Sequence, residues 1–137
     1  MAYQASFPVR TTGRGLIEIT SQVAELVSEI APVTGIVHVF VKHTSCSLVI
    51  TENADPSVRR DLETLAQRWA PDGDPAYWHD MEGEDDMSAH ARSVLTDTSV
   101  TVPVDRGRLL LGPWQGIYLW EHRTHGHCRE VVVTVIG

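Results

Sequence analysis

The sequence has no long apolar run and only two cysteines. No stretch of its 137 residues approaches the roughly 20 apolar residues of a membrane-spanning helix. The first residues, MAYQASFPVRTTGRG, lack the basic start and apolar run of a signal peptide. Cys46 and Cys128 are far apart, which argues against a disulfide framework or a Cys-x-x-Cys zinc site. We therefore expect a cytoplasmic protein with no membrane partner and with reduced thiols.

Positive charge is also scarce. Eleven Lys and Arg residues stand against 18 Asp and Glu residues, which gives a net charge of -7 at pH 7. Proteins that bind a phosphate backbone normally carry a basic face, so we expect no nucleic-acid partner. The length and the apolar fraction of 42% fit one compact domain over residues 1–137.

Strand patterns dominate the chain. Runs rich in β-branched and aromatic residues predict strands in GIVHVFVKH from Gly35, SLVITE from Ser47, SVTVPV from Ser99, GIYLWEHR from Gly116 and REVVVTVI from Arg129. Because strands dominate and most gaps have the size of a hairpin turn, the sequence predicts an α+β domain. Its sheets should be largely antiparallel or arranged as a sandwich.

Two or three helices are predicted. SQVAELVSEI and DPSVRRDLETLAQRW have apolar residues at helical spacing, and in the second Asp55 should cap a helix that begins at Pro56. A shorter helix is expected from Asp86 or Ser88, either of which could cap it, to about Leu95. Its expected apolar face consists of Ala91, Val94 and Leu95.

Charged or polar residues stand where several apolar strand faces end. Because side chains alternate along a strand, His43 extends the valine face of the first strand if that strand continues, and Glu52 extends the second. If THGHC closes a hairpin, Arg123 lies near Arg129 and Glu121 would be their counter-ion. Any one of these residues, taken alone, is explained equally well as a residue that faces solvent at the end of a strand. The set predicts a shared polar pocket, because unpaired buried charge is costly.

The segment HDMEGEDDMSAH places five carboxylates between His79 and His90. Histidines and carboxylates in a short segment can bind a divalent metal such as zinc, although a spacing of eleven is no zinc signature by itself. The alternative is a solvated acidic loop. With His43, the two histidines would form a three-histidine site with an open position for water or substrate. A rival cluster in a predicted turn comprises His122, His125 and His127.

Four motifs resemble the YjbQ-like family of small bacterial and archaeal proteins. They are HTSCSLVITENADPSVRRDLE, HDMEGEDDMSAHARSVL, GRLLLGPWQGIYLWEHR and the closing REVVVTVIG, so the resemblance covers about His38 to Gly137. It implies an α+β fold with β-sandwich-like sheets, usually assembled as a homotrimer. The family is often labelled as a secondary thiamine-phosphate synthase, which joins a pyrimidine pyrophosphate to a thiazole phosphate and releases pyrophosphate.

The resemblance also implies which residues form the site. The expected metal ligands are His43, His79 and His90. The expected acid-base residues are Glu82, Asp86, Glu52 and Glu121. The expected substrate or cofactor contacts are Thr44, Ser45, Asn53, Arg92, Gln115, Arg123 and Arg129, and Asp55 belongs to the same motifs.

The chain departs from the usual family pattern at four positions. The family typically has lysine at Arg92, alanine at Cys46, proline at Ser88 and threonine at Pro113. Arg92 could still bind phosphate, as a planar fork. Cys46 beside the histidine motif could suggest a Cys-His nucleophile, but the usual alanine favours a small buried thiol.

These residues predict a metal-dependent enzyme that acts on a small phosphorylated or anionic metabolite. The histidines would hold a divalent metal, most simply zinc, while Glu82 or Asp86 supports a ring or moves a proton. A phosphate or carboxylate group would be held by Arg92, Arg123 and Arg129.

Two enzymatic alternatives and one non-enzymatic alternative stay open. A synthase would more naturally use magnesium, which prefers carboxylates to imidazoles, whereas a metal-dependent hydrolase suits the histidines. A trimeric module could also bind a metal or metabolite without transforming it. The four tryptophans could be interface anchors or ordinary core residues: Trp69, Trp78, Trp114 and Trp120.

Overall fold

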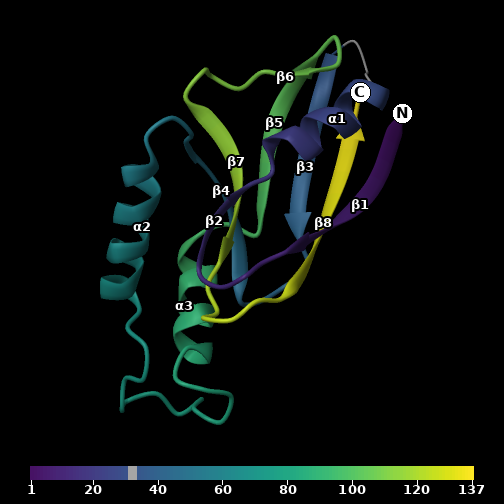
Figure 1. Cartoon of the computed structure of the whole chain (residues 1–137). Coiled ribbons are helices and arrows are strands. Elements are labelled where there is room, and N and C mark those ends of the chain that lie inside the picture. The colour runs from purple at the N-terminus through teal and green to yellow at the C-terminus, as the bar shows by residue number, and fades with distance from the viewer. Residues whose placement is uncertain (31–33) are drawn as a thin grey trace.

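The computed structural model describes residues 1–30 and 34–137, and in these residues two antiparallel sheets are combined with three helices (Figure 1). The elements follow the order β1 (Ala2–Arg10), β2 (Gly15–Glu18), α1 (Thr20–Ile30), β3 (Thr34–Val41), β4 (Cys46–Glu52), α2 (Pro56–Trp69), α3 (Asp86–Leu95), β5 (Ser99–Asp105), β6 (Arg108–Leu109), β7 (Gln115–Glu121) and β8 (Cys128–Ile136). The predicted α+β class is confirmed.

The larger sheet has five strands in the order β1-β8-β3-β5-β6, and the smaller sheet has the order β2-β7-β4. The five predicted strands correspond to β3, β4, β5, β7 and β8, whereas β1, β2 and β6 were not predicted. Strand β1 lies at the sheet edge, paired with β8, which is where a strand tolerates a proline such as Pro8. Its inward side chains Ala5, Phe7 and Val9 do alternate with exposed ones.

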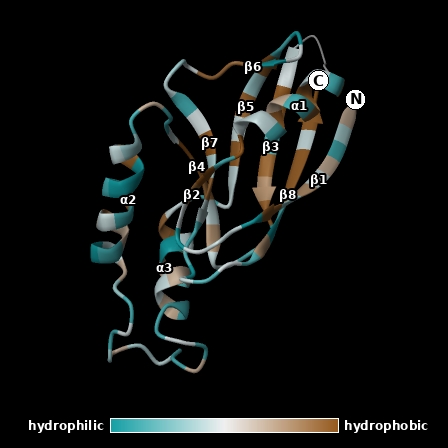
Figure 2. Ribbon diagram, in the orientation of Figure 1, coloured by the Kyte–Doolittle hydropathy of each residue, from teal (hydrophilic) through white to brown (hydrophobic). Residues whose placement is uncertain are grey.

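The hydrophobic core lies between the two sheets and is closed at one end by α1. Strand alternation places every second residue of β3 and β8 in this core, and both strands have hydrophobic segments, drawn brown in Figure 2. The central side chains are Val37, Val39, Val41, Val131, Val133, Val135, Leu48, Ile117, Leu119, Val23 and Val27.

Strand β7 is buried on both faces, because α2 and α3 cover the side of the smaller sheet that faces away from the larger one (Figure 1). Ile117 and Leu119 point into the core. On the other face, the Trp120 Nε1 atom donates to Glu63 of α2 at 2.8 Å, and Tyr118 is hydrogen-bonded to Arg59 at 3.1 Å. The double coverage explains the nearly continuous apolar sequence of this strand.

Helix α2 begins as predicted. Pro56 is its first residue, and the Asp55 side chain accepts a hydrogen bond from the Ser57 backbone N–H at 2.9 Å. Among the described residues, no helix is both long and apolar enough to cross a membrane.

Helix α3 corrects two predictions. Its N-cap is Asp85 and not Asp86 or Ser88. The predicted apolar face points outward, because Val94 is 83% and Leu95 61% exposed. The buried side chains are mostly polar: Asp86, Ser88, Ala89, Arg92 and Ser93. Helical periodicity alone misidentified the buried face, because these polar groups find hydrogen-bond partners inside the protein.

Candidate metal centre

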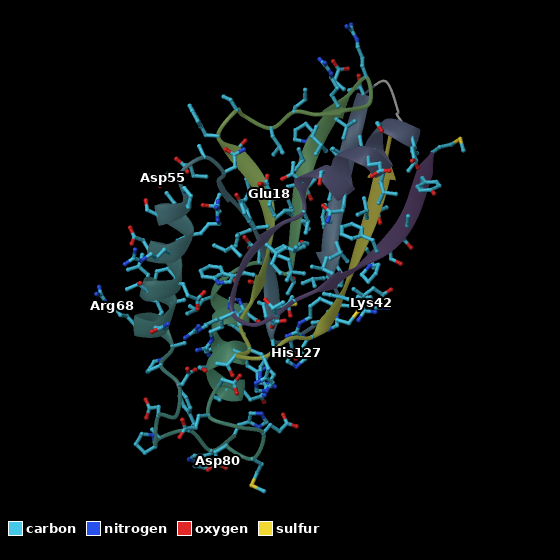
Figure 3. All side chains as sticks on the ribbon, in the orientation of Figure 1. Glu18, Lys42, Asp55, Arg68, Asp80 and His127 are labelled. Carbon is cyan, nitrogen blue, oxygen red and sulfur yellow. The ribbon has the colours of Figure 1, made fainter. Side chains whose placement is uncertain are left out.

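Residues 70–85, called the arm below, connect α2 to α3 and extend beyond the ends of both sheets (Figure 1). Figure 3 shows Asp80 near the tip of the arm, far from Glu18 and Asp55. The root is fixed by Arg14, whose guanidinium donates to both oxygens of Asp72 at 2.6 Å. This double ion pair gives an otherwise irregular segment a defined position.

His79 of the arm meets Asp86 and His90 of α3. The Asp86 Oδ2 atom lies 2.6 Å from Nε2 of His79 and 3.1 Å from Nε2 of His90. All three potential ligand atoms lie within 4.8 Å of one another. Ligand atoms around a tetrahedral zinc ion with bonds of about 2.1 Å stand about 3.4 Å apart. The two oxygen–nitrogen distances at Asp86 would therefore have to lengthen for the three atoms to enclose such an ion.

The hydrogen bonds of His90 orient its ring toward Asp86. Its Nδ1 atom lies 2.9 Å from the carbonyl oxygen of Thr44, which can only accept, so Nδ1 carries a proton and donates. A carbonyl partner of this kind fixes the ring of many metal-binding histidines. The Nε2 atom then faces the Asp86 carboxylate and needs either a second proton or a metal cation between them.

Asp86 is held in place from the opposite side. Arg123 donates from Nη1 to the Asp86 Oδ1 atom at 2.7 Å and from Nε to Asp85 at 3.0 Å. Burial alone would raise the pKa of Asp86, but its hydrogen bond with His79 and the charges of His90 and Arg123 lower it overall. Asp86 is therefore a fixed carboxylate whose second oxygen faces both histidines.

Glu82 stands beside the cluster but outside the three-ligand group. Its Oε2 atom lies 3.6 Å from the Nε2 atom of His79, and its side chain is 65% exposed. A solvated carboxylate at this distance can exchange protons with the cluster through one water molecule.

His43 lies outside the cluster. Its Nε2 atom accepts a hydrogen bond from the backbone N–H of Glu130 at 2.8 Å, so the lone pair of this nitrogen is not available to a metal. The ring lines a cavity that His90 also lines. The structure thus brings together two of the three expected histidines and supplies Asp86 as the third donor. The rival histidines do not join the cluster, and His125 stacks on His127 elsewhere.

Glu121 and Arg129 form a separate buried network. The Arg129 guanidinium donates to Glu121 at 2.8 and 2.5 Å and to the Ser45 hydroxyl at 3.0 Å, while Thr11 donates to Glu121 at 2.7 Å. Both charged side chains are almost fully buried. The pair connects the two sheets, because Glu121 ends β7 and Arg129 belongs to β8.

The predicted THGHC hairpin is wrong. The segment joins β7 to β8, which belong to different sheets. Consequently Arg123 and Arg129 do not share a counter-ion: the Arg129 side chain pairs with Glu121, whereas that of Arg123 reaches Asp85 and Asp86.

Glu52, Asn53, Asp55 and Gln115 lie at the opposite end of the smaller sheet. They are separated from its other end by the length of β4, about 20 Å for seven residues. Glu52 accepts from the backbone N–H groups of Ala54 and Asp55, and Asn53 donates to the carbonyl of Gln115. In this structure these side chains shape turns, and they do not contact the cluster of His79, Asp86 and His90.

The arginines expected to bind phosphate are already paired. Arg92 is 1% exposed and donates to Glu63 at 3.0 Å and to the carbonyl of Ala70. Arg123 and Arg129 hold the carboxylates described above. The Cys46 thiol is also unavailable, because burial raises its pKa to about 12.

Sequence reasoning missed the anchors of the centre. Asp85 accepts from the backbone N–H and the hydroxyl of Thr124 at 2.8 and 3.0 Å. Ser88 donates to Asp72, which Arg14 also holds. Asp85 is one of several acidic residues just before a predicted helix, which is a weak sequence signal for its role. No local sequence pattern connects Arg14 with Asp72.

The residue that directly follows β7, His122, has a buried imidazole. His122 is fully buried, its Nε2 atom lies 2.8 Å from the Ser47 hydroxyl, and its Nδ1 atom has no hydrogen-bond partner in the described part of the chain. Burial, and then the nearby charge of Arg92, lower its pKa from 6.5 to about 3. His122 is therefore neutral in the folded protein near neutral pH.

We predict that His122 makes stability fall as the pH is lowered. Below pH 6.5 the unfolded chain binds a proton here that the folded chain does not, so the stabilisation is complete above pH 6.5 and is lost toward pH 3. The loss from this residue should be about 2 kcal/mol between pH 7.5 and 5. Urea denaturation in the presence of a chelator measures it. His122→Gln should reduce the pH dependence by this amount, and equal pH dependence in both proteins would refute the prediction.

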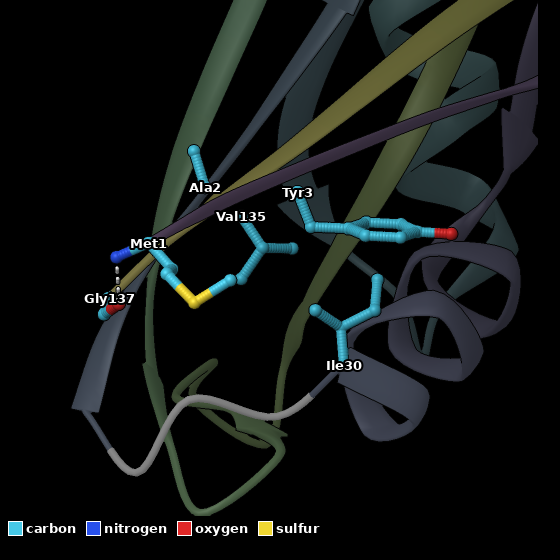
Figure 4. Close-up of a pocket in the computed structure, with 6 residues that line it drawn as sticks. All are labelled: Met1, Ala2, Tyr3, Ile30, Val135 and Gly137. Carbon is cyan, nitrogen blue, oxygen red and sulfur yellow. Dashed lines mark hydrogen bonds between the residues drawn. The ribbon is translucent and has the colours of Figure 1, made fainter.

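A second hollow lies between the two chain ends. Figure 4 shows this apolar cleft of about 310 Å³, with Met1, Tyr3 and Ile30 on its walls and a hydrogen bond from the N-terminus to Gly137. Its lining within residues 1–30 and 34–137 has neither histidine nor carboxylate side chains, and in Figure 1 the chain ends lie at the opposite end of the molecule from the arm.

The comparisons with known proteins cover nearly the whole chain. Residues 5–137 match the family model described as UPF0047 protein YjbQ-like. A UPF0047 protein of Synechocystis sp. is 46% identical over 135 residues, covering 98% of this chain and 92% of that protein. The UPF0047 protein YjbQ of Salmonella typhimurium is 44% identical over 138 residues, covering 100% of this chain and 99% of that protein.

Solved structures show the same fold. A hypothetical protein of Aeropyrum pernix has a TM-score of 0.90 at 29% identity and covers 98% of each chain. An uncharacterised YjbQ/UPF0047 family protein of Clostridium acetobutylicum has a TM-score of 0.87 at 34% identity, covering 96% of this chain and 99% of that one. The family match thus includes most of β1 and all of β2, which the sequence motifs had left out. The chain belongs to the UPF0047 family of YjbQ-like proteins.

Proposed function

We propose that this protein is a metal-dependent enzyme in which His79, Asp86 and His90 hold a divalent cation, most simply zinc. The observation that carries the proposal is that one carboxylate oxygen, Asp86 Oδ2, faces the Nε2 atoms of two histidines. One divalent cation at this point would take the place of the two protons that otherwise lie between the carboxylate oxygen and the two imidazole nitrogens. Two imidazoles and one carboxylate also form a donor set that zinc uses in catalytic sites.

The reaction class that best fits these residues is hydrolysis of a small substrate. A divalent metal supplies Lewis acidity, which polarises a substrate oxygen and acidifies a water molecule. The Thr44 carbonyl would keep the ring of His90 oriented, because it accepts from Nδ1 and leaves Nε2 for the metal. Glu82 is close enough to receive a proton and exposed enough to release it to solvent.

The paired arginines make a pyrophosphate-releasing synthase a weaker proposal. Such a reaction needs free cationic groups or a magnesium site rich in carboxylates. Arg92, Arg123 and Arg129 are each neutralised by a protein carboxylate. An anionic group of the substrate would therefore be held at the metal and not by these arginines.

Assembly as a homotrimer, which the family resemblance implies, remains part of the proposal. Three of the four tryptophans lie outside the core: Trp78 is 98%, Trp114 64% and Trp69 52% exposed. Trp78 and the 91% exposed Met81 belong to the arm that carries His79. Exposed apolar side chains of this size are typical of surfaces that another chain covers.

The test is hydrolysis of activated probes by zinc-loaded protein. With p-nitrophenyl acetate and p-nitrophenyl phosphate, we expect zinc-dependent turnover of at least one probe that falls about 100-fold in Glu82→Gln. Zinc affinity should be retained in this variant. Asp80→Asn, which removes an exposed carboxylate from the same arm, is the matched control and should keep full turnover.

Three results would count against this proposal. Turnover that does not require zinc would be background from exposed imidazoles. Unchanged turnover in Glu82→Gln would remove the proton-transfer role of that residue. Stoichiometric zinc without turnover of either probe would favour a binding module over an enzyme.

A further inference from the structure

A cavity of about 540 Å³ with both polar and apolar walls adjoins the candidate metal centre, and the two share the ring of His90 as a wall. Its other walls come from His43 and Thr44, from the last turns of α3, and from the loop that leads into β5. This volume lies within the range of sites that bind small metabolites. The cavity could therefore hold the part of a substrate that extends away from the metal.

The electrostatic character of the cavity is negative. Its one acidic side chain is Asp97, and no Lys or Arg lines it in the described part of the chain. Helix α3 ends here, at Leu95, so its last carbonyl groups add partial negative charge. The nearby cation Lys42 is paired with Glu130 at 3.5 Å. Burial, and then the charge of Arg129, lower the pKa of His43, so this ring is neutral near pH 7.

The cavity also presents hydroxyl groups. Ser93 and Thr96 donate to backbone carbonyls, whereas the hydroxyls of Thr44, Thr98 and Ser99 have no protein partner among the described residues. Hydroxyl oxygens can accept hydrogen bonds from an ammonium group and can exchange hydrogen bonds with the hydroxyls of a polyol. Apart from the ring of His90, whose Nε2 atom faces Asp86, the described lining offers nothing that would neutralise a carboxylate or phosphate.

We propose that this cavity binds the hydroxylated, amine-bearing end of the substrate, with the protonated amine beside Asp97. The inference rests on the proposed function, because it describes the substrate of the same centre. It adds the sign of the charge: the end remote from the metal is cationic and not anionic.

Three six-carbon polyols that differ in charge test the inference: 1-amino-1-deoxysorbitol, sorbitol and gluconate. Each is titrated into metal-free, nitrogen-15-labelled protein at pH 7.5, and the amide signals of residues 96–99 are followed by NMR. The amine should bind about tenfold tighter than gluconate, with sorbitol between them. In Asp97→Asn the difference should shrink to about threefold or less, whereas the matched variant Asp61→Asn, on the exposed face of α2, should keep it.

The metal-free condition separates this inference from the proposed metal function. Tighter binding of gluconate, an unchanged preference in Asp97→Asn, or no saturable shift with any of the three polyols would overturn the inference even if the protein binds zinc. Conversely, the charge preference would stand in a protein that fails to bind zinc, and only the proposed metal chemistry would then be lost.

Discussion

Replacing Glu121 by alanine should lower the free energy of unfolding by about 3–5 kcal/mol. Glu121 is fully buried, and the variant leaves the 4% exposed guanidinium of Arg129 without its counter-ion. The Thr11 hydroxyl also loses its shorter hydrogen bond and keeps only the carbonyl of His127, at 3.2 Å, as an acceptor. Urea denaturation followed by circular dichroism measures the change.

A double variant separates the pair from the packing around it. Glu121→Leu combined with Arg129→Met removes both charges and keeps similar volume, so it should recover most of the lost stability. This variant also keeps the test valid if Glu121→Ala does not fold. A loss below about 1 kcal/mol in Glu121→Ala, or a double variant less stable than the single one, would show that Arg129 is not dependent on Glu121.

Replacing Asp86 by asparagine should weaken zinc binding by about 100-fold or more. The asparagine keeps the shape of the side chain, but it removes the charge that faces His79 and His90. Competition titration of metal-free protein against a chromophoric chelator measures the affinity. Thermal denaturation in the presence of chelator shows whether the variant is folded, because Asp86 also pairs with Arg123.

Asp80→Asn is the matched control for this effect. Asp80 is exposed and lies on the same arm, so the substitution changes the net charge equally without removing a proposed ligand. Equal losses of affinity in the two variants would indicate diffuse attraction by the acidic arm. Unchanged affinity in Asp86→Asn would remove Asp86 from the ligand set.

Much of the fold was accessible from the sequence because its strands obey simple periodicities. The valine rows of β3 and β8 predicted the central strands and their inward faces, and Asp55 and Pro56 predicted the start of α2. Strand β1 was missed, because Pro8 and exposed polar residues obscure its alternation. The face of α3 was misjudged because its burial depends on partners distant in sequence, such as Glu63 for Arg92.

The site was harder to predict, because convergence is a property of topology. The spacing of His79 and His90 indicated candidate ligands but could not place them around Asp86. His43 resembled the other two in residue type, and a single backbone contact with Glu130 sets it apart. In the sequence, Arg123 follows one apolar strand and Arg129 begins another, so the two looked equivalent. They have different carboxylate partners because the chain crosses from one sheet to the other between them.

The zinc content of the protein and of three histidine variants tests the proposed centre most directly. Metal-free protein is loaded with one equivalent of zinc, passed over a desalting column and measured by elemental mass spectrometry. The parent and His43→Ala should retain about one zinc per chain, whereas His79→Ala and His90→Ala should lose most of it. No retained zinc in the parent, or equal retention in all three variants, would contradict a metal centre at His79, Asp86 and His90.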